Sequence, residues 1–284
     1  MPSGELATFQ LLRRWAEWME VSGRHAATTR TQYRRYAIAF IAATLIPLDE
    51  LTEDDVVEYL ATLPAKGAMR GQTIRALSSL CRFAHRHGAI TSDPMAYISV
   101  PRRKYGDAAY LEPDELEQVL TAAERLDPRA RPALELMYAT GARVGSFCAV
   151  MPEDVDLRKQ TIHFRVTKGD KPYTNPLEGR GLAAATRLLE LRDYVAPHGP
   201  QHRRPTLVGV GPVVIQRWAK LAGEMVGIKV WTHLLRHTFC ERIANDPNVP
   251  EIVVVELMNW SDSSQMRRYA KARDGLKRAA VSSV

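Results

Sequence analysis

Apolar side chains recur every three or four positions through the first hundred residues. Between Ala7 and Val21 they include Phe9, Leu12 and Trp15. This spacing places them on one face of an α-helix, and a bundle buries such faces against one another. The same spacing predicts helices over residues 7–21, 28–44, 53–63 and about 72–87.

The pattern changes once in the second half, where apolar and polar residues alternate from Thr161 to Thr167. Alternation with a period of two is typical of a half-buried β-strand. Lys168–Lys171 then fits a turn and Pro172–Leu177 a returning strand, so this segment predicts a β-hairpin. The resulting fold class is mainly α with a small β-sheet. Further helices are predicted at about 114–125, 129–140, 181–194, 211–226, 232–245, 250–258 and 264–270.

Residues 100–107 divide the chain. They combine a proline, three consecutive basic residues and a glycine, which is a composition typical of a linker. After them, Leu111 to Glu115 places acidic residues in what would be the first turn of a helix, where the helix dipole favours them. We therefore predict a helical domain over 1–100, a basic linker over 101–109 and a second domain over 110–284.

The charge balance is basic, with 39 Lys and Arg against 32 Asp and Glu, and 30 of the basic residues are Arg. A guanidinium matches phosphate with two parallel donors, so an Arg-rich surface suits nucleic acid, although a GC-rich genome produces the same bias. The most apolar stretch, Ile252–Met258, is too short to span a bilayer, and no secretory leader is visible. Three widely spaced cysteines predict neither a disulfide framework nor a zinc knuckle. We expect a cytoplasmic protein without a membrane partner.

Two candidate functional residues lie in predicted turns. Arg143 is flanked by Gly141 and Gly145, and glycines let a backbone approach a ligand closely. Lys168 lies at the tip of the predicted hairpin. Each also has an ordinary structural explanation, because turns often carry an Arg and a Lys at a hairpin tip is usually only solvated.

The segment that begins at Thr232 predicts a helix able to bind an anion. His233 and Arg236 are three apart and share a face, close to an N-terminus that Thr232 would cap. His233 and His237 have the i,i+4 spacing of zinc-protease ligands, but Leu234 stands where that motif needs a glutamate, so no metal site is predicted. The alternative is an amphipathic helix with two surface histidines.

Near the C-terminus, Trp260 and Tyr269 lie nine residues apart in a basic neighbourhood. Each can also be a core residue. A phenol with an ordinary pKa of ~10 is a poor nucleophile until nearby cations favour the phenolate. Two arginines, a lysine, a histidine and a tyrosine together describe a phosphoryl-transfer site that needs no metal carboxylates. The arginines would clamp a phosphodiester, the histidine would move a proton, the lysine would protonate the leaving alkoxide and the tyrosine would attack phosphorus.

The order and spacing of these residues resemble the tyrosine recombinase (phage integrase) family, in a simple form without an arm-binding domain. Thr140–Val144 resembles the family's T-G-x-R-[IV] box, Thr167–Leu177 its hairpin G-K-G-x-K…P-L, and His233–Phe239 its H-x-L-R-H-[ST]-F box. Trp260 and Tyr269 repeat the spacing of the family's His or Trp and its nucleophilic Tyr. The resemblance implies a helical core-type DNA-binding domain over 1–100 and a mixed α/β catalytic domain of the DNA breaking-rejoining fold over 110–284.

The resemblance also implies a role for each residue. Arg143 and Arg236 would bind the scissile phosphate, and Lys168 would be the general acid for the 5′-oxygen. His233 would assist proton transfer at Tyr269, which would form a 3′-phosphotyrosyl intermediate. Because that covalent bond preserves the energy of the phosphodiester, the family's strand exchange needs no ATP, metal or other cofactor.

Three positions depart from the family pattern. Ser146 replaces an acidic residue that normally supports the site, and Tyr173 replaces an arginine of the returning strand. One extra residue separates Arg236 from Trp260, and residues 246–248 offer a natural place for it. Trp260 itself would support the phosphate where many members use His. None of these departures removes a catalytic group.

The partner implied by the resemblance is double-stranded DNA that carries short recombination core sites, bound by four protomers on two paired sites. The host would be a prokaryotic, archaeal or phage-infected cytoplasm, and an accessory directionality factor stays open. The tail Gly275–Val284 either docks on a neighbouring protomer or is a frayed terminus. The DNA-binding residues would be Arg34, Arg75, Arg82, Arg102, Arg103 and Lys104.

Two other functions remain open on the sequence. A type IB topoisomerase-like enzyme uses much of the same chemistry but relaxes supercoils without exchanging partners. An inactive relative that only binds DNA is the second alternative, because Ser146 leaves the geometry of the site in doubt. The DNA target and the biological setting, whether integration, chromosome resolution or element mobility, do not follow from these residues.

Overall fold

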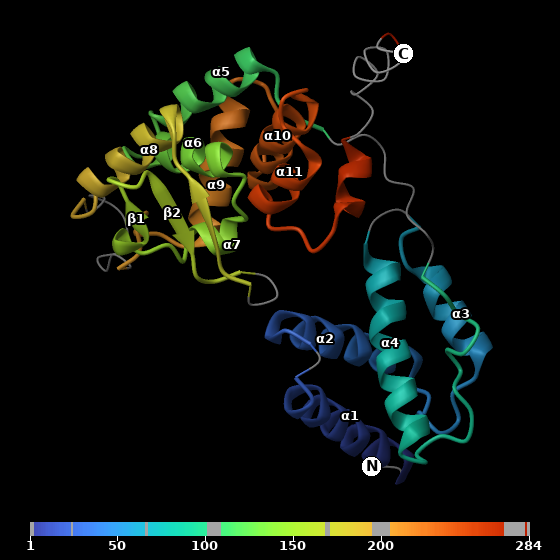
Figure 1. Ribbon diagram of the computed structural model, residues 1–284. Helices are drawn as coiled ribbons and strands as arrows, with labels where there is room; N and C mark the ends of the chain where they lie inside the picture. Colours follow the sequence, from blue (N-terminus) through green and yellow to red (C-terminus); the bar gives the residue numbers. More distant parts are fainter. Residues whose placement is uncertain are drawn as a thin grey trace. The chain divides into compact units, whose positions relative to one another are not determined.

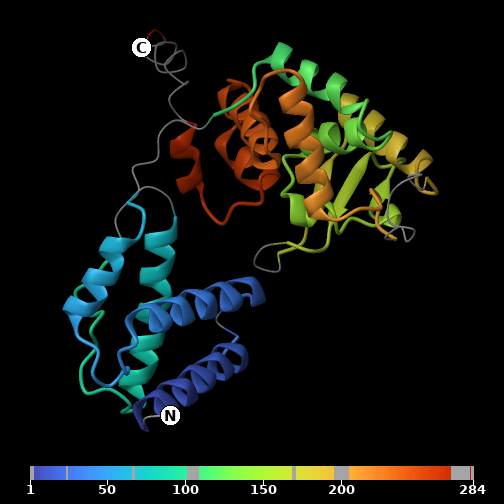
Figure 2. The ribbon, with the colours of Figure 1, turned by 180° about the vertical axis from the view of Figure 1, so that it is seen from behind.

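The chain forms two units, residues 1–104 and 105–284, in a computed structural model (Figure 1 and Figure 2). Three predictions lie outside the residues that the structure describes: the basic linker residues 101–108, Lys168, and the tail apart from Ser282. The predicted domain boundaries therefore stay a prediction. The described residues are 3–23, 25–65, 68–100, 109–167, 171–194, 205–269 and 282.

Four helices build the first unit: α1 (Ser3–Val21), α2 (Ala27–Thr44), α3 (Glu53–Thr62) and α4 (Met69–Arg86). Helix α2 packs against each of the other three, so it is the centre of the bundle. Each helix turns its apolar face inward, as its spacing predicts. The side chains that are fully buried between them include Trp15, Met19, Phe40, Leu77 and Leu80.

The start of α3 shows how local sequence sets a helix boundary. Thr52 Oγ1 accepts a hydrogen bond from the Asp55 amide, and the Asp55 carboxylate accepts one from the Thr52 amide. This capping box satisfies two amide donors that a helix end leaves without partners. The spacing of Thr52 and Asp55 is visible in the sequence and marks the boundary to the residue.

Five longer helices form most of the second unit: α5 (Pro113–Ala123), α6 (Ala130–Thr140), α8 (Gly179–Glu190), α9 (Pro212–Met225) and α10 (Thr232–Asn245). Helix α6 lies at the centre, against α5, α8, α9 and α10. The apolar faces of α5, α6 and α9 share one buried core, and Leu234 and Leu235 of α10 lie in the same core. This shared core fixes α10 to the rest of the unit. In the described parts of the chain, no helix is long and apolar enough to cross a membrane.

The sheet has three antiparallel strands in the order β1 (Val155–Asp156), β2 (Thr161–Phe164), β3 (Tyr173–Pro176). The predicted hairpin is β2 and β3, with both strands shorter than predicted. Beyond β2 the Thr167 hydroxyl bonds the Lys171 backbone instead of continuing the ladder. Strand β1 was not predicted. The fold class, mainly α with a small β-sheet, is confirmed.

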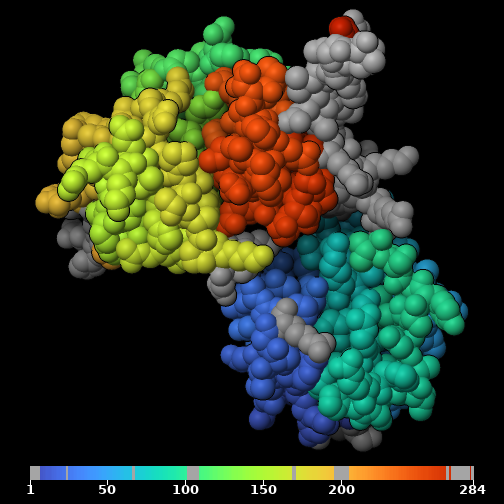
Figure 3. All heavy atoms as spheres, in the orientation of Figure 1, coloured from blue at the N-terminus to red at the C-terminus, as the bar shows by residue number. Residues whose placement is uncertain are grey.

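Short elements complete the second unit: α7 (Val144–Phe147), η1 (Pro152–Asp154), α11 (Glu251–Leu257) and η2 (Ser263–Arg268). Helix α7 was not predicted, and η2 is a 3₁₀ helix where an α-helix over 264–270 was predicted. Side chains of α10, α11 and η2 form a separate buried cluster, and these elements are orange to red in Figure 3. This cluster positions the C-terminal aromatic residues.

Candidate active site

Arg236 lies on the second turn of α10 and is only 3% exposed. Its Nη1 donates to the Gly141 carbonyl at 2.6 Å and its Nη2 to the Met258 carbonyl at 2.7 Å. The guanidinium therefore joins the end of α6 to the end of α11, with its plane fixed by two bonds. Both partners are neutral carbonyls, so they orient the positive charge without neutralising it.

Arg143 supplies a second positive charge close to the first. Burial, and after it the charge of Arg143, lower the pKa of Arg236 to about 10. None of the ion pairs formed by the described residues includes either arginine. Two neighbouring cations favour a bound anion, so this pair is the strongest candidate for a phosphate site.

Gly141 makes the close approach at this site possible. Its backbone is left-handed, with φ at +60°, and a Cβ there would lie 2.6 Å from Phe239 Cδ1 and 3.1 Å from Met258 Sδ. A side chain would therefore be strained twice, by its conformation and by its neighbours. The glycine lets α6 end against α10 with its carbonyl directed at Arg236.

A second side chain, Asn175 of β3, joins the same two segments. Its Nδ2 donates to the Thr140 carbonyl at 3.1 Å and to the Leu257 carbonyl at 3.0 Å, and the side chain is 2% exposed. Asn175 and Arg236 thus each form hydrogen bonds to the ends of both α6 and α11, at neighbouring backbone positions. Sequence reasoning missed Asn175, although a polar residue between Tyr173 and Leu177 on the inward side of a strand was a visible signal.

Tyr269 follows η2 and is 4% exposed. Its hydroxyl forms a short hydrogen bond with Nδ1 of His237, and the Trp260 ring lies nearly parallel to it, with centroids 6.0 Å apart. The phenol also acts electrostatically on Arg236. The structure therefore brings the predicted nucleophile, the predicted Trp and one of the two arginines together.

His233 is exposed and lies one turn before His237, whose ring it meets edge-on at 4.6 Å between centroids. It lines a cleft of about 970 Å³ together with Arg143, Trp231 and two lysines of the α9 region. The prediction that Thr232 caps α10 is wrong. Trp231 is the N-cap residue, no side chain caps the helix, and Thr232 is a buried first residue of α10.

Two of the departures from the family pattern, Tyr173 and Ser146, lie close to the arginine pair. Tyr173 stacks on Phe164, with ring centroids 4.7 Å apart. Burial raises the pKa of Tyr173 while Arg236 and Arg143 lower it, so the phenol lies within the field of the arginine pair. Ser146 is a buried residue of α7, the short helix that begins directly after Arg143. Neither departure displaces the arginines.

The geometry agrees with a comparison to known families: the phage integrase family matches residues 109–275, more than half of the chain. The chain belongs to the phage integrase family. It is similar to a tyrosine recombinase of Thermosipho africanus, with 24% identity that covers 96% of this chain and 98% of the relative. It is also similar to the tyrosine recombinase XerA of Pyrococcus horikoshii, with 26% identity over 98% and 94%.

The fold is shared with a solved structure of lambda integrase, a dimer bound to a core site. The TM-score is 0.76 at 19% identity, over 94% of this chain and 96% of that one. A lambda integrase tetramer bound to a Holliday junction gives a TM-score of 0.73 at 19% identity, over 90% and 78%. Both the helical bundle and the α/β unit therefore have counterparts in a family structure.

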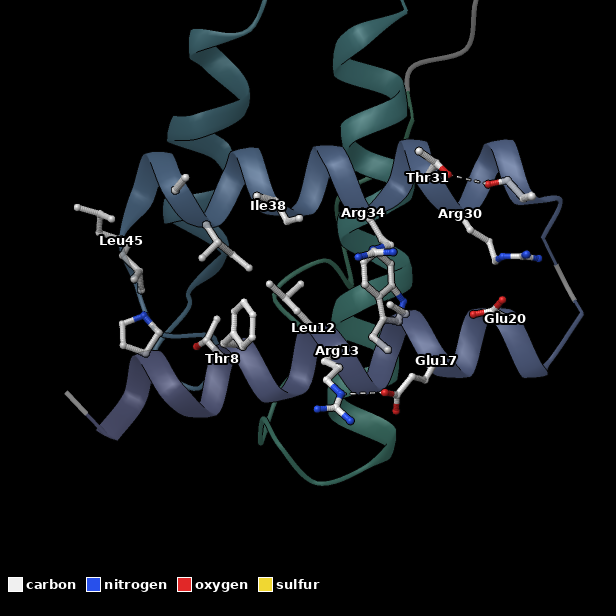
Figure 4. A pocket seen from close by; sticks show the side chains of 18 residues that line it. Thr8, Leu12, Arg13, Glu17, Glu20, Arg30, Thr31, Arg34, Ile38 and Leu45 are labelled. Atoms are coloured by element: carbon white, nitrogen blue, oxygen red, sulfur yellow. Dashed lines mark hydrogen bonds and ion pairs between the residues drawn. The ribbon is translucent and has the colours of Figure 1, made fainter. Parts of the chain in front are cut away.

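The predicted DNA-binding residues divide between two grooves of the first unit. Arg75 and Arg82 are exposed and line a groove of about 440 Å³ on one face of α4, where Arg86 joins them. Arg34 instead lies in a groove of about 830 Å³ between α1 and α2 (Figure 4). The remaining three predicted residues, Arg102, Arg103 and Lys104, lie outside the described residues.

The groove between α1 and α2 mixes apolar and charged side chains. Phe9 and Ile38 line it and stay 69% and 52% exposed, and Arg13 pairs with Glu17 across one turn of α1 (Figure 4). Carboxylates in this groove offset the arginines. The face of α4 is therefore the better candidate for contact with a phosphate backbone.

Proposed function

We propose that this protein is a site-specific tyrosine recombinase, which cleaves and rejoins double-stranded DNA through a 3′-phosphotyrosyl intermediate. The observation that carries the proposal is the arginine pair. Arg143 and Arg236 are adjacent cations that form no ion pair within the described chain, and the hydroxyl of Tyr269 lies within the field of Arg236. Membership of the phage integrase family supports the same activity.

In the proposed reaction, the two arginines hold the nonbridging oxygens of the scissile phosphate and stabilise the charge that grows on them. Tyr269 attacks phosphorus, the bond from phosphorus to the 5′-oxygen breaks, and Lys168 protonates that oxygen. Trp260 supports the bound phosphate, and His233 contacts it from the cleft that it shares with Arg143. A 5′-hydroxyl from the partner strand reverses the steps and rejoins the DNA.

The DNA partner follows from the same proposal. Residues 1–100 form the core-type DNA-binding domain, and the α4 arginines contact the backbone together with linker residues 101–109. Residues 110–284 form the catalytic domain. Four protomers assemble on two sites, as lambda integrase does on its junction. The protein acts in the cytoplasm, and an accessory factor that sets direction remains open.

The decisive experiment is covalent capture on nicked duplexes. Because the target is not known, the protein is incubated with a pool of randomised nicked DNA, and adducts that survive denaturation are isolated and sequenced. We expect an adduct with the native protein and with Tyr110→Phe, which removes an exposed hydroxyl of the same unit. Tyr269→Phe should give none.

Two outcomes would change the assignment. Relaxation of supercoiled plasmid with no sequence preference among the adducts favours a topoisomerase-like enzyme. DNA binding without any adduct from the native protein favours an inactive relative, for which Ser146 is the first residue to restore to an acid.

A further inference from the structure

We propose that His237 is the base that takes the proton from Tyr269 when the tyrosine attacks DNA. The inference rests on the proposed recombinase activity and adds a catalytic residue to it. The family resemblance assigns proton transfer at the nucleophile to His233. In this structure, however, the imidazole bonded to the phenol is that of His237, one helical turn further along α10.

The contact places the two groups where a proton can pass between them. For His237 to act as the base, the phenol donates to Nδ1 of a neutral imidazole whose other ring nitrogen carries the hydrogen. Both side chains are nearly enclosed, with 8% of His237 and 4% of Tyr269 exposed. Bulk water therefore competes little for the proton, and the base is already within hydrogen-bond distance of the atom that must lose it.

Helix α10 explains how the base and the phosphate site meet. Arg236 and His237 are consecutive, so their side chains leave the helix about 100° apart. Arg236 reaches the carbonyls of Gly141 and Met258, while His237 reaches Tyr269. One turn of one helix thus orients both the phosphate and the nucleophile, and His233 is left to face the cleft lined by Arg143.

Cleavage exchanges one bond to phosphorus for another. The bond between Tyr269 oxygen and phosphorus forms as the phenol proton moves to Nδ1 of His237. The bond between phosphorus and the 5′-oxygen breaks, and that oxygen takes a proton from the general acid. During rejoining the 5′-hydroxyl attacks phosphorus and gives its proton to the deprotonated general acid. The bond between phosphorus and Tyr269 oxygen breaks, and the imidazolium of His237 returns its proton to the departing tyrosine.

The test compares two nucleophiles in the presence and absence of the base. His237→Asn keeps a polar group near the position of Nδ1 but cannot carry a proton, and should slow adduct formation by Tyr269 about 100-fold or more. In the second arm, a fluorinated tyrosine, whose phenol loses its proton more readily, replaces Tyr269 as nucleophile. There His237→Asn should slow adduct formation much less, because a more acidic phenol depends less on a base.

His163→Asn is the matched control, because Nδ1 of His163 also bonds a hydroxyl, that of Thr174, away from the site. It should change neither reaction. DNA affinity and thermal unfolding of each variant are measured in parallel, and His237→Gln provides a second substitution if the first one unfolds.

The outcomes separate the two proposals. A large loss of adduct rate with the native tyrosine and a much smaller loss with the fluorinated tyrosine support His237 as the base. An equal fall in both reactions assigns His237 to the phosphate site and overturns the inference, as does an unchanged adduct rate. If the native protein forms no adduct, the recombinase activity itself fails.

Discussion

Asn175 offers the sharpest test of how the site is held together. Asn175→Ala removes two buried hydrogen bonds and leaves the carbonyls of Thr140 and Leu257 without their side-chain donor. A hydrogen bond contributes about 1 kcal/mol net, and an acceptor left unsatisfied in a buried place costs about 1–3 kcal/mol. We therefore expect the second unit to lose about 2–4 kcal/mol of unfolding free energy.

The matched control is Thr174→Ala on the same strand. Thr174 is exposed and makes a single bond to His163, so its loss should cost less than about 1 kcal/mol. Asn175→Asp should be worse than Asn175→Ala, because a carboxylate cannot donate and would face two carbonyl oxygens. The loss of unfolding free energy is therefore expected to increase from Thr174→Ala to Asn175→Ala to Asn175→Asp.

Because the chain has two units, the assay must report on the second one alone. Hydrogen exchange of peptides from α6 and α10, followed by mass spectrometry across a urea series, gives its unfolding free energy. Adduct formation should fall along with stability in Asn175→Ala, since the same two segments carry the carbonyls that orient Arg236. Equal stabilities for Asn175→Ala and Thr174→Ala would refute the claim that Asn175 holds the ends of α6 and α11 together.

Three further predictions concern the surroundings of the site and the first unit. Gly141→Ala should lower stability and adduct yield more than Gly179→Ala in thermal and gel assays, because both glycines have positive φ but only Gly141 has neighbours that a Cβ would strike. Inorganic phosphate should raise the melting temperature of the second unit more than chloride at equal ionic strength, and Arg143→Gln should abolish that difference, since phosphate relieves the repulsion that Arg236 experiences. Burial raises the pKa of the Cys81 thiol to about 12, so iodoacetamide at pH 8 should modify Cys81 only in unfolded protein, as detected by peptide mass.

The sequence predicted the long elements because a repeated period needs length to be visible. The predicted helix over 232–245 has the observed bounds of α10, and the predicted start of α3 at Glu53 is also observed. Helix α7 and strand β1 span only four and two residues, too few for any period to show. Their positions are set instead by tertiary contacts: α7 packs against α9, and β1 pairs with β2.

The candidate site divides in the same way. The glycine-flanked Arg143 and the box around Arg236 are local patterns, so reading along the chain finds them. The roles of Asn175 and His237 depend on partners 35, 82 and 32 residues away, which no local pattern encodes. Spacing singled out His233 on this helix, whereas the fold shows that the imidazole bonded to the phenol is that of His237.

These contacts explain how the fold tolerates a buried cation at the centre of its site. Burial and Arg143 both disfavour the charge of Arg236, as its lowered pKa records. Two carbonyl acceptors offset part of that cost, and they stay in place because Gly141 permits the approach and Asn175 holds the neighbouring residues. The remaining electrostatic cost is recovered only when an anion binds between the arginines. A site organised in this way holds its charges in place before the DNA arrives, so a bound phosphate gains their attraction without having to reorganise the protein.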